Sequence, residues 1–320
     1  MTLRGASAPA REAGNRPGRV VSLLPSATEI LHLLGAGDLL VGRSEECDYP
    51  PAVSALPVVM RARTRDADRP SAEIDARVQA VRGAGESLYV LDLEKLQALR
   101  PDVIFTQDLC GVCSVTEEEV RRACRAVGLE AAIVSLSPRT LPEVAESIRT
   151  VARAVGRDRP AEAILAELEA RERRAGRRGD RRPPRLAVIE WVDPPILAGL
   201  WAPDQITGAG GRPMEGVHSG AVGVRTSWPE LARAAPEIAV VSPCSFSVER
   251  TERELAEPGI SRAVARLGCP VWIADEAYFS RPGPRLWDGL ELLHDLVDGA
   301  PRRTPRPVHR WTGAGAGAVA

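Results

Sequence analysis

One sequence pattern occurs twice in this chain, at residues 93–106 and again at residues 228–241. Each copy has an early acidic residue, Glu94 or Glu230, and then a proline, a second acid and an apolar run. Proline lacks a backbone N–H and clashes with the preceding turn, so each copy predicts a short helix that ends there. The apolar run that follows is typical of a buried parallel strand. Two such helix–strand units predict two similar α/β lobes.

The composition excludes several classes of protein. The 320 residues have a formal net charge of −1, so no general attraction to nucleic acid or to a membrane surface follows. No apolar run approaches the ~20 residues that cross a bilayer, so we expect no membrane span. Residues 1–18 have neither an apolar core of signal-peptide length nor a lipobox cysteine, which predicts a cytoplasmic protein.

The order of predicted elements divides the chain into five parts. Residues 1–18 and 301–320 are expected to be disordered tails, because they are rich in Gly, Ala, Arg and Pro. Residues 19–138 predict an N-terminal α/β lobe, residues 139–182 a helical connector that Gly156 interrupts, and residues 183–300 a C-terminal α/β lobe. Strand–helix alternation predicts mostly parallel sheets in two Rossmann-like lobes, with ligand loops at the C-terminal ends of their strands.

Local signals refine this division. Ser26 and Glu29, and again Thr116 and Glu119, have the spacing of a helix N-cap and its partner in a capping box. Residues 61–73 are charged and rich in turn formers, which predicts a loop.

Several motifs, in order and with matching spacing over residues 19–300, resemble the cobalamin-binding substrate-binding proteins of vitamin B12 ABC importers. The motifs are Val20–Ile30, Val41–Ser44, Asp48–Pro51, residues 93–105, Asp193–Pro195 and Tyr278–Arg285. The resemblance implies a class III periplasmic-binding-protein-like fold, in which a long α-helix joins the two lobes. It also implies a small-molecule or metal-chelate ligand, such as cobalamin or another corrinoid, held between the lobes, and an ABC permease as partner.

The same resemblance implies roles for particular residues. Family members hold the corrin ring with aromatic side chains on loops, and Glu46 and Gln107 stand where an aromatic can occur. Asp108 follows Gln107 directly. The second lobe offers Trp191, Trp201, Trp228, Tyr278 and Phe279, and Arg281 matches a ligand-binding arginine of the family. Glu94 and Glu230 match the acids that dock on a transporter, although Glu230 lies one residue closer to its proline.

The cysteines suggest a second possibility. Cys47, Cys110 and Cys113 lie on loops that follow neighbouring strands of the predicted first sheet, and Cys244 and His218 lie on loops of the second lobe. Three thiolates and a fourth ligand suit zinc or an iron–sulfur cluster. Cysteine is also common as a buried packing residue, so packing is the alternative.

Two functions follow. The first is a binding protein for a corrinoid or another metal chelate. The second is a cytoplasmic metalloprotein on the same scaffold, with Cys47, Cys110 and Cys113 around a metal. Whether it would be an enzyme stays open; Glu46, Asp108 or Glu190 would then move protons.

Overall fold

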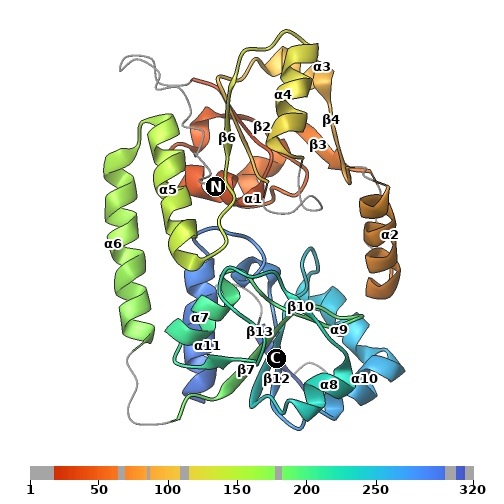
Figure 1. The fold of residues 1–320 in the computed structure, drawn as a ribbon. Helices are drawn as coiled ribbons and strands as arrows, with labels where there is room; N and C mark the ends of the chain where they lie inside the picture. The colour runs from red at the N-terminus through yellow and green to blue at the C-terminus, as the bar shows by residue number, and fades with distance from the viewer. Residues whose placement is uncertain are drawn as a thin grey trace, which may run out of the picture. The chain divides into compact units, whose positions relative to one another are not determined.

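The computed structural model describes residues 18–63, 69–84, 87–108, 115–176, 182–299 and 308–313, which form two compact units. Unit 1 comprises Met1–Arg65, Ala80–Ser137 and Glu146–Ala163, and unit 2 comprises Asp66–Gln79, Pro138–Ala145 and Ile164–Ala320. Figure 1 shows the elements of each unit with the labels used below. Among the described residues, none of the helices combines the length and apolarity that crossing a bilayer requires.

Unit 1 is built on a six-stranded sheet in the order β4-β3-β2-β1-β5-β6, in which only the β3–β4 pair is antiparallel. Its strands are β1 Val20–Ser22, β2 Leu40–Ser44, β3 Val58–Ala62, β4 Tyr89–Leu91, β5 Val103–Thr106 and β6 Ala132–Ser135. Its helices include α1 Pro25–Leu33, α3 Leu93–Leu99 and α4 Glu117–Ala126. Every residue of β1 and β5 is buried, as expected for central parallel strands.

Unit 2 is built on a seven-stranded sheet in the order β10-β8-β7-β11-β12-β13, with β9 paired to β7. The strands are β7 Arg185–Trp191, β8 Ile196–Leu197, β9 Arg212–Pro213, β10 Val224–Arg225, β11 Ile238–Val241, β12 Val271–Ala274 and β13 Val308–Trp311. The helices include α7 Ala202–Gly208, α8 Trp228–Arg233, α9 Val248–Ala256, α10 Pro258–Ala265 and α11 Leu286–Val297. Strands β7, β11 and β12 are parallel neighbours, so the predicted α/β class with mostly parallel central strands is confirmed.

The repeated pattern folds in the same way in both units. In unit 1, α3 leads into β5, and in unit 2, α8 leads into β11. The residue before each proline adopts a left-handed backbone, with φ 41° at Arg100 and φ 50° at Ala235. The left-handed backbone ends the right-handed helix at these residues, where the following proline disfavours its continuation.

The connector consists of two helices, α5 Leu141–Val155 and α6 Asp158–Ala175, as the periodicity predicted. Gly156 separates them with a left-handed backbone, φ 65°. Within unit 1, Arg149 of α5 donates to Glu162 of α6 at 2.9 Å.

Three local expectations were wrong. Part of the expected C-terminal tail forms β13, which pairs antiparallel with β12 and covers that edge of the sheet. Helix α2, Ser71–Gly83, begins inside the expected loop 61–73. Helix α1 begins at Pro25 with Leu24 as its N-cap, because proline suits the first helical position, and Ser26 makes no cap. The capping box of Thr116 and Glu119 is present.

Helix α2 also departs from the expected division into lobes. Its first turns belong to unit 2, where Arg225 donates two hydrogen bonds to the carboxylate of Asp75, at 3.0 and 2.7 Å. Ser71 donates through its backbone N–H to Glu254 of α9 at 2.8 Å. No periodic signal in the sequence anticipates this assignment, because it depends on distant polar contacts.

Candidate functional site

The carboxyl ends of the parallel strands are the part of each unit where ligand-binding loops are expected. In unit 1, β1 lies between β2 and β5, so connections leave it in both directions and the loops after these strands define a switch point. Glu46 follows β2, and Gln107 and Asp108 follow β5. The structure therefore brings these three predicted residues to one edge of one sheet.

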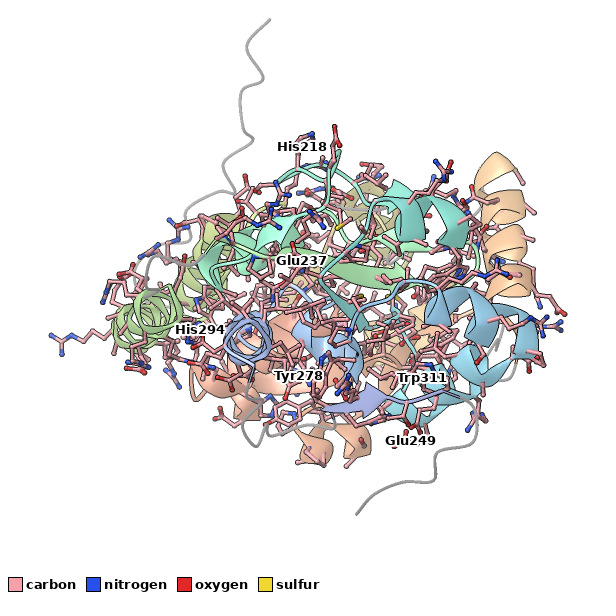
Figure 2. The ribbon with its side chains drawn as sticks, turned by 90° about the horizontal axis from the view of Figure 1, so that it is seen from below. His218, Glu237, Glu249, Tyr278, His294 and Trp311 are labelled. Atoms are coloured by element: carbon pink, nitrogen blue, oxygen red, sulfur yellow. The ribbon has the colours of Figure 1, made fainter. Side chains whose placement is uncertain are left out.

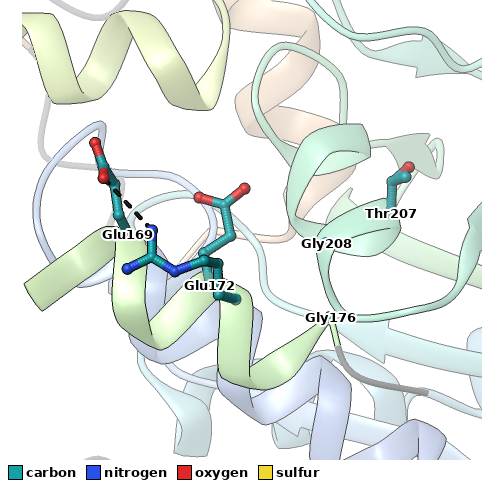
Figure 3. A pocket seen from close by; sticks show the side chains of 6 residues that line it. Glu169, Glu172, Gly176, Thr207 and Gly208 are labelled. Carbon is teal, nitrogen blue, oxygen red and sulfur yellow. Dashed lines mark ion pairs between the residues drawn. The ribbon is translucent and has the colours of Figure 1, made fainter. Parts of the chain in front are cut away.

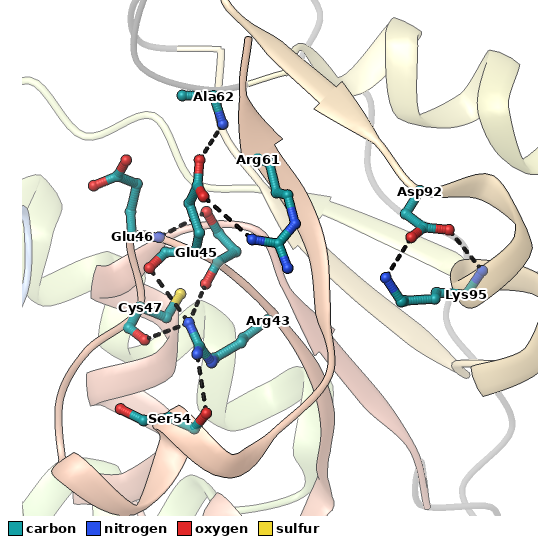
Figure 4. A network of polar contacts seen from close by, with 10 residues as sticks. Arg43, Glu45, Glu46, Cys47, Ser54, Arg61, Ala62, Asp92 and Lys95 are labelled. Atoms are coloured by element: carbon teal, nitrogen blue, oxygen red, sulfur yellow. Dashed lines mark hydrogen bonds and ion pairs between the residues drawn. The ribbon is translucent and has the colours of Figure 1, made fainter. Parts of the chain in front are cut away.

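Much of the charge at this edge of unit 1 is committed to holding loops. Arg43 donates from Nη1 to the carbonyl oxygens of Ser44, Glu45 and Cys47 at 3.0, 3.3 and 3.1 Å, as Figure 4 shows. Its Nη2 donates to the carbonyl of Ser54 at 3.1 Å. The loop after β2 is thus fixed by a single guanidinium with several donors.

The carboxylates beside Arg43 divide into two kinds. Glu45 accepts the backbone N–H of Ala62 and lies 3.6 Å from Arg61, so it joins the loop to β3. The side chain of Glu46 points away from Arg43 in Figure 4 and is half-buried. Glu46 therefore differs from Glu45 in the direction of its carboxylate.

Gln107 and Asp108 differ in how far they reach solvent. Gln107 is buried at 8% exposure. Asp108 accepts the backbone N–H of Glu117 at the start of α4 at 2.8 Å, and its own N–H donates to Ser137 Oγ at 2.9 Å. Asp108 remains exposed, so its carboxylate is fixed in place and open to solvent.

Tyr49 was not among the predicted ligand contacts. It follows the Arg43-fixed loop and is 42% exposed, which is unusual for a large ring. Tyr49 lies in the motif Asp48–Pro51 that resembles the family. The motif does not show whether the ring is exposed or buried, so the sequence did not identify Tyr49 as a ligand contact.

The corresponding edge of unit 2 carries an aromatic pair. Trp191 at the end of β7 meets Phe246, on the loop after β11, edge to face with ring centroids 5.3 Å apart. The guanidinium carbon of Arg250 lies 3.5 Å from the centroid of the Phe246 ring, a cation–π contact. Phe246 is buried and Trp191 is half-buried, so Trp191 is the member of the pair that reaches solvent.

An ion pair follows β12 at the same edge. Glu276 accepts from Arg281 Nη2 at 2.5 Å through one oxygen and from the backbone N–H of Ser245 at 2.5 Å through the other. The Arg281 side chain is 11% exposed and the Glu276 side chain is 14% exposed. Ser245 has a left-handed backbone, φ 62°, which is rare for a non-glycine residue. Glu276 therefore joins the loop after β11 to Arg281.

Four of the predicted ring contacts belong to the core of unit 2 instead. Tyr278 and Phe279 are 0% and 2% exposed in one apolar cluster, and Trp228 is 8% exposed in another. Trp201 is 4% exposed and donates from Nε1 to the carbonyl of Phe279 at 2.6 Å. These rings offer no face to a ligand in this conformation, because burial of apolar area is their strongest driving force. Periodicity and resemblance do not distinguish such core rings from exposed ones.

The predicted metal ligands do not come together in the described residues. Cys47 is 1% exposed, and its sulfur accepts from Thr28 Oγ1 at 3.1 Å, which favours packing. Cys110 and Cys113 lie outside the described residues. Within the described ranges, no three His, Cys, Asp or Glu side chains form a group that can hold a metal ion.

The remaining predicted ligands, His218 and Cys244, lie in different surroundings. His218 is exposed, and Figure 2 places it at the periphery of unit 2, whereas Tyr278 lies among packed side chains. Cys244 is half-buried on the loop after β11, two residues before Phe246. Cys269 is different again, because burial raises the pKa of its thiol to about 11.

The predicted docking acids are both exposed on short helices of the repeat. Glu94 lies in the first turn of α3. Glu230 lies in the first turn of α8, where its carboxylate accepts from the Ser227 hydroxyl at 2.8 Å and from the Ser227 N–H at 3.0 Å. These hydrogen bonds lower the pKa of Glu230, so it stays ionised.

A hollow of about 410 Å³ lies elsewhere on unit 2 and is lined by Glu169, Glu172, Arg173, Gly176, Thr207 and Gly208 (Figure 3). Glu169 pairs with Arg173 at 3.6 Å, and burial raises the pKa of Glu172. The hollow is formed by the last turns of α6 and α7, so it is separate from the strand ends that carry the candidate site.

Comparison with known proteins agrees with this arrangement of strands and loops. The family model described as periplasmic binding protein matches residues 20–263, so the chain belongs to that family. It is 24% identical over 277 residues to the vitamin B12-binding protein of Pectobacterium atrosepticum, covering 84% of this chain and 85% of the relative.

Solved structures share the fold. A periplasmic heme-binding protein from Pseudomonas aeruginosa matches with a TM-score of 0.67 and 21% identity, over 92% of this chain and 98% of the other. The periplasmic vitamin B12-binding protein of Vibrio cholerae matches with a TM-score of 0.63 and 21% identity, over 88% and 97%. The family match confirms the predicted class of binding protein, and the solved structures confirm the predicted fold.

Proposed function

We propose that this chain binds cobalamin or another corrinoid, with Trp191 as the principal contact from unit 2. The observation that carries this proposal is the Trp191–Phe246 pair at the carboxyl ends of β7 and β11. An indole held against a buried ring loses little conformational freedom when a flat ligand packs on it. Relatives named for vitamin B12 and for heme support a large, flat metal chelate as the ligand.

Polar groups at the same edges suit the rim of such a ligand. Arg281 supplies N–H donors and is held by Glu276, and Glu46 and Asp108 offer acceptors in unit 1. A macrocycle with polar side groups needs both donors and acceptors, because unpaired polar groups lose affinity when they leave water.

Titration with cyanocobalamin tests the proposal. We expect saturable quenching of tryptophan fluorescence and a matching heat signal, with one ligand per chain and a Kd in the micromolar range or below. Trp191→Ala should weaken binding while circular dichroism stays unchanged. No saturable signal with cyanocobalamin or with dicyanocobinamide at 100 μM would refute corrinoid binding.

We propose that this chain docks on an ABC permease through Glu94 and Glu230. Both carboxylates are exposed and near a helix N-terminus, so they can meet arginines of a partner. Replacing both with Gln should abolish capture by the matching permease and leave cyanocobalamin affinity unchanged. Such docking requires the protein on the outer side of the membrane, so cell fractionation decides between it and the predicted cytoplasmic location.

The zinc or iron–sulfur hypothesis now depends on Cys110 and Cys113. Metal analysis of the purified protein, with a Cys110→Ser, Cys113→Ser double variant as control, tests it directly. Stoichiometric zinc or iron that the double variant loses would support it, and metal content near zero in both proteins would refute it.

A further inference from the structure

The ion pair after β12 bears on which corrinoid side groups the site accepts. Both oxygens of Glu276 are engaged, one with Arg281 Nη2 and one with the N–H of Ser245, each at 2.5 Å. The pair is mostly buried, at 14% and 11% exposure. Charges in such a position are weakly screened, so the positive charge of Arg281 is largely balanced by Glu276.

Two other charged groups of these loops are engaged in contacts within unit 2. Asp275 caps the turn after β12 by accepting the N–H of Ala277 at 3.0 Å. Arg250 lies over the Phe246 ring and donates to the carbonyl of Arg69 at 2.9 Å.

A neutral carboxamide suits this arrangement better than a carboxylate. A carboxamide has an oxygen that accepts from Arg281 and an NH₂ group that donates to Glu276. A carboxylate accepts only, so one that approaches Arg281 also meets the like charge of Glu276 at short range. A carboxamide and a carboxylate are nearly equal in shape, so the site can distinguish them only by their charge and hydrogen-bonding groups.

We infer that the paired Glu276 and Arg281 select corrinoids with carboxamide side groups over those with carboxylates. This inference rests on the proposed function. It assigns Glu276 as a specificity-determining residue, because Glu276 supplies the carboxylate that pairs with Arg281.

Cyanocobalamin and its three monocarboxylic acids, in which one propionamide is hydrolysed, test the inference at pH 7.5. We expect at least one isomer to bind about tenfold more weakly than cyanocobalamin, a difference of ~1.4 kcal/mol. Glu276→Gln should shrink that ratio to about threefold or less, because Arg281 then favours the carboxylate. Arg281→Gln should widen the ratio, because Glu276 remains without its partner.

Matched controls separate the possible outcomes. Glu167→Gln, on α6 and paired with Arg174 at 2.9 Å, should leave the ratio unchanged. Equal affinity for cyanocobalamin and all three acids, or an unchanged ratio in both the Glu276 and Arg281 variants, would overturn the selection and leave corrinoid binding intact. Absence of cyanocobalamin binding would instead overturn the proposed function and this inference with it.

Discussion

The carboxyl-end loops of the two units have the same place in the fold and different contents. In unit 1, the side chains of Arg43, Glu45 and Asp108 form hydrogen bonds with nearby backbone groups. In unit 2, the same edge presents an aromatic pair and the Glu276–Arg281 ion pair. The repeated topology therefore determines where the ligand loops lie, and the side chains on those loops determine which ligand each edge can bind.

This difference predicts that the loops of unit 2 contribute more to the proposed corrinoid affinity than the loops of unit 1. Three features test the difference between the units: the reactivity of their cysteines, the contribution of their exposed aromatic rings to ligand affinity, and the ion pairs that hold neighbouring segments.

The thiols after β2 and β11 should show the largest contrast. Cys47 is 1% exposed and accepts from Thr28, whereas Cys244 is half-buried on its loop. We expect iodoacetamide at pH 8 to modify Cys244 on the order of 100-fold faster, since Cys47 requires local opening that costs several kcal/mol. Peptide mapping by mass spectrometry measures each site separately, with Cys269 as a slow internal reference. Similar rates at Cys47 and Cys244 would contradict the contrast.

The aromatic rings give the next largest effect. Trp191→Ala should weaken cyanocobalamin binding about 30-fold, the ~2 kcal/mol typical of a well-packed anchor residue. Trp272→Phe in β12, which packs against an apolar cluster of unit 2, is the matched control and should leave the affinity unchanged. Calorimetric titration of both variants measures the effect. A loss below twofold for Trp191→Ala would remove unit 2 as the main source of affinity.

Sequence reasoning predicted the framework because the framework depends on local signals. Proline positions, apolar periodicity and glycine breaks located β1, β5, β12, α5 and the helix–strand repeat. Helix α2 and strand β13 were missed, because their positions depend on distant partners such as Arg225 and β12.

The candidate site was predictable only as a set of loops. Trp191, Arg281 and Glu46 are at the expected edges, but Trp201, Trp228, Tyr278 and Phe279 are core residues. The sequence alone does not distinguish a buried aromatic ring from an exposed one, because burial depends on packing against residues far away in the chain. Phe246 and Glu276 were missed because their roles arise from contacts with Trp191 and Arg281.

The exposed ring of unit 1 should have a smaller effect than Trp191. Tyr49 is 42% exposed, so Tyr49→Ala should lower cyanocobalamin affinity about threefold, or ~0.7 kcal/mol, if its ring packs on the ligand. Tyr49→Phe keeps the ring and should bind like the unchanged protein, which distinguishes packing from a role of the hydroxyl. A loss for Tyr49→Ala as large as that for Trp191→Ala would show that the two edges contribute equally.

The smallest effect concerns the first turns of α2, which belong to unit 2. Arg225 lowers the pKa of Asp75 from its ordinary value of 3.8 through two hydrogen bonds. A lowered carboxyl pKa contributes stability that is present above pH 3.8 and is lost as the pH falls through the folded-state value. Asp75→Asn should therefore speed hydrogen exchange of residues 71–79 about threefold at pH 7, as expected for a partly exposed pair worth ~0.5 to 1 kcal/mol.

The pH dependence and a second variant make this prediction specific to the ion pair. The difference between Asp75→Asn and the unchanged protein should shrink towards zero as the pH falls through the folded-state pKa of Asp75, because Asp75 is then uncharged in both the folded and the unfolded state. Arg225→Gln should have the same effect at pH 7, and combining both substitutions should add little, because either one removes the pair. Additive effects would mean that Asp75 and Arg225 act through other contacts and that α2 is held to unit 2 mainly by Ser71 and Glu254.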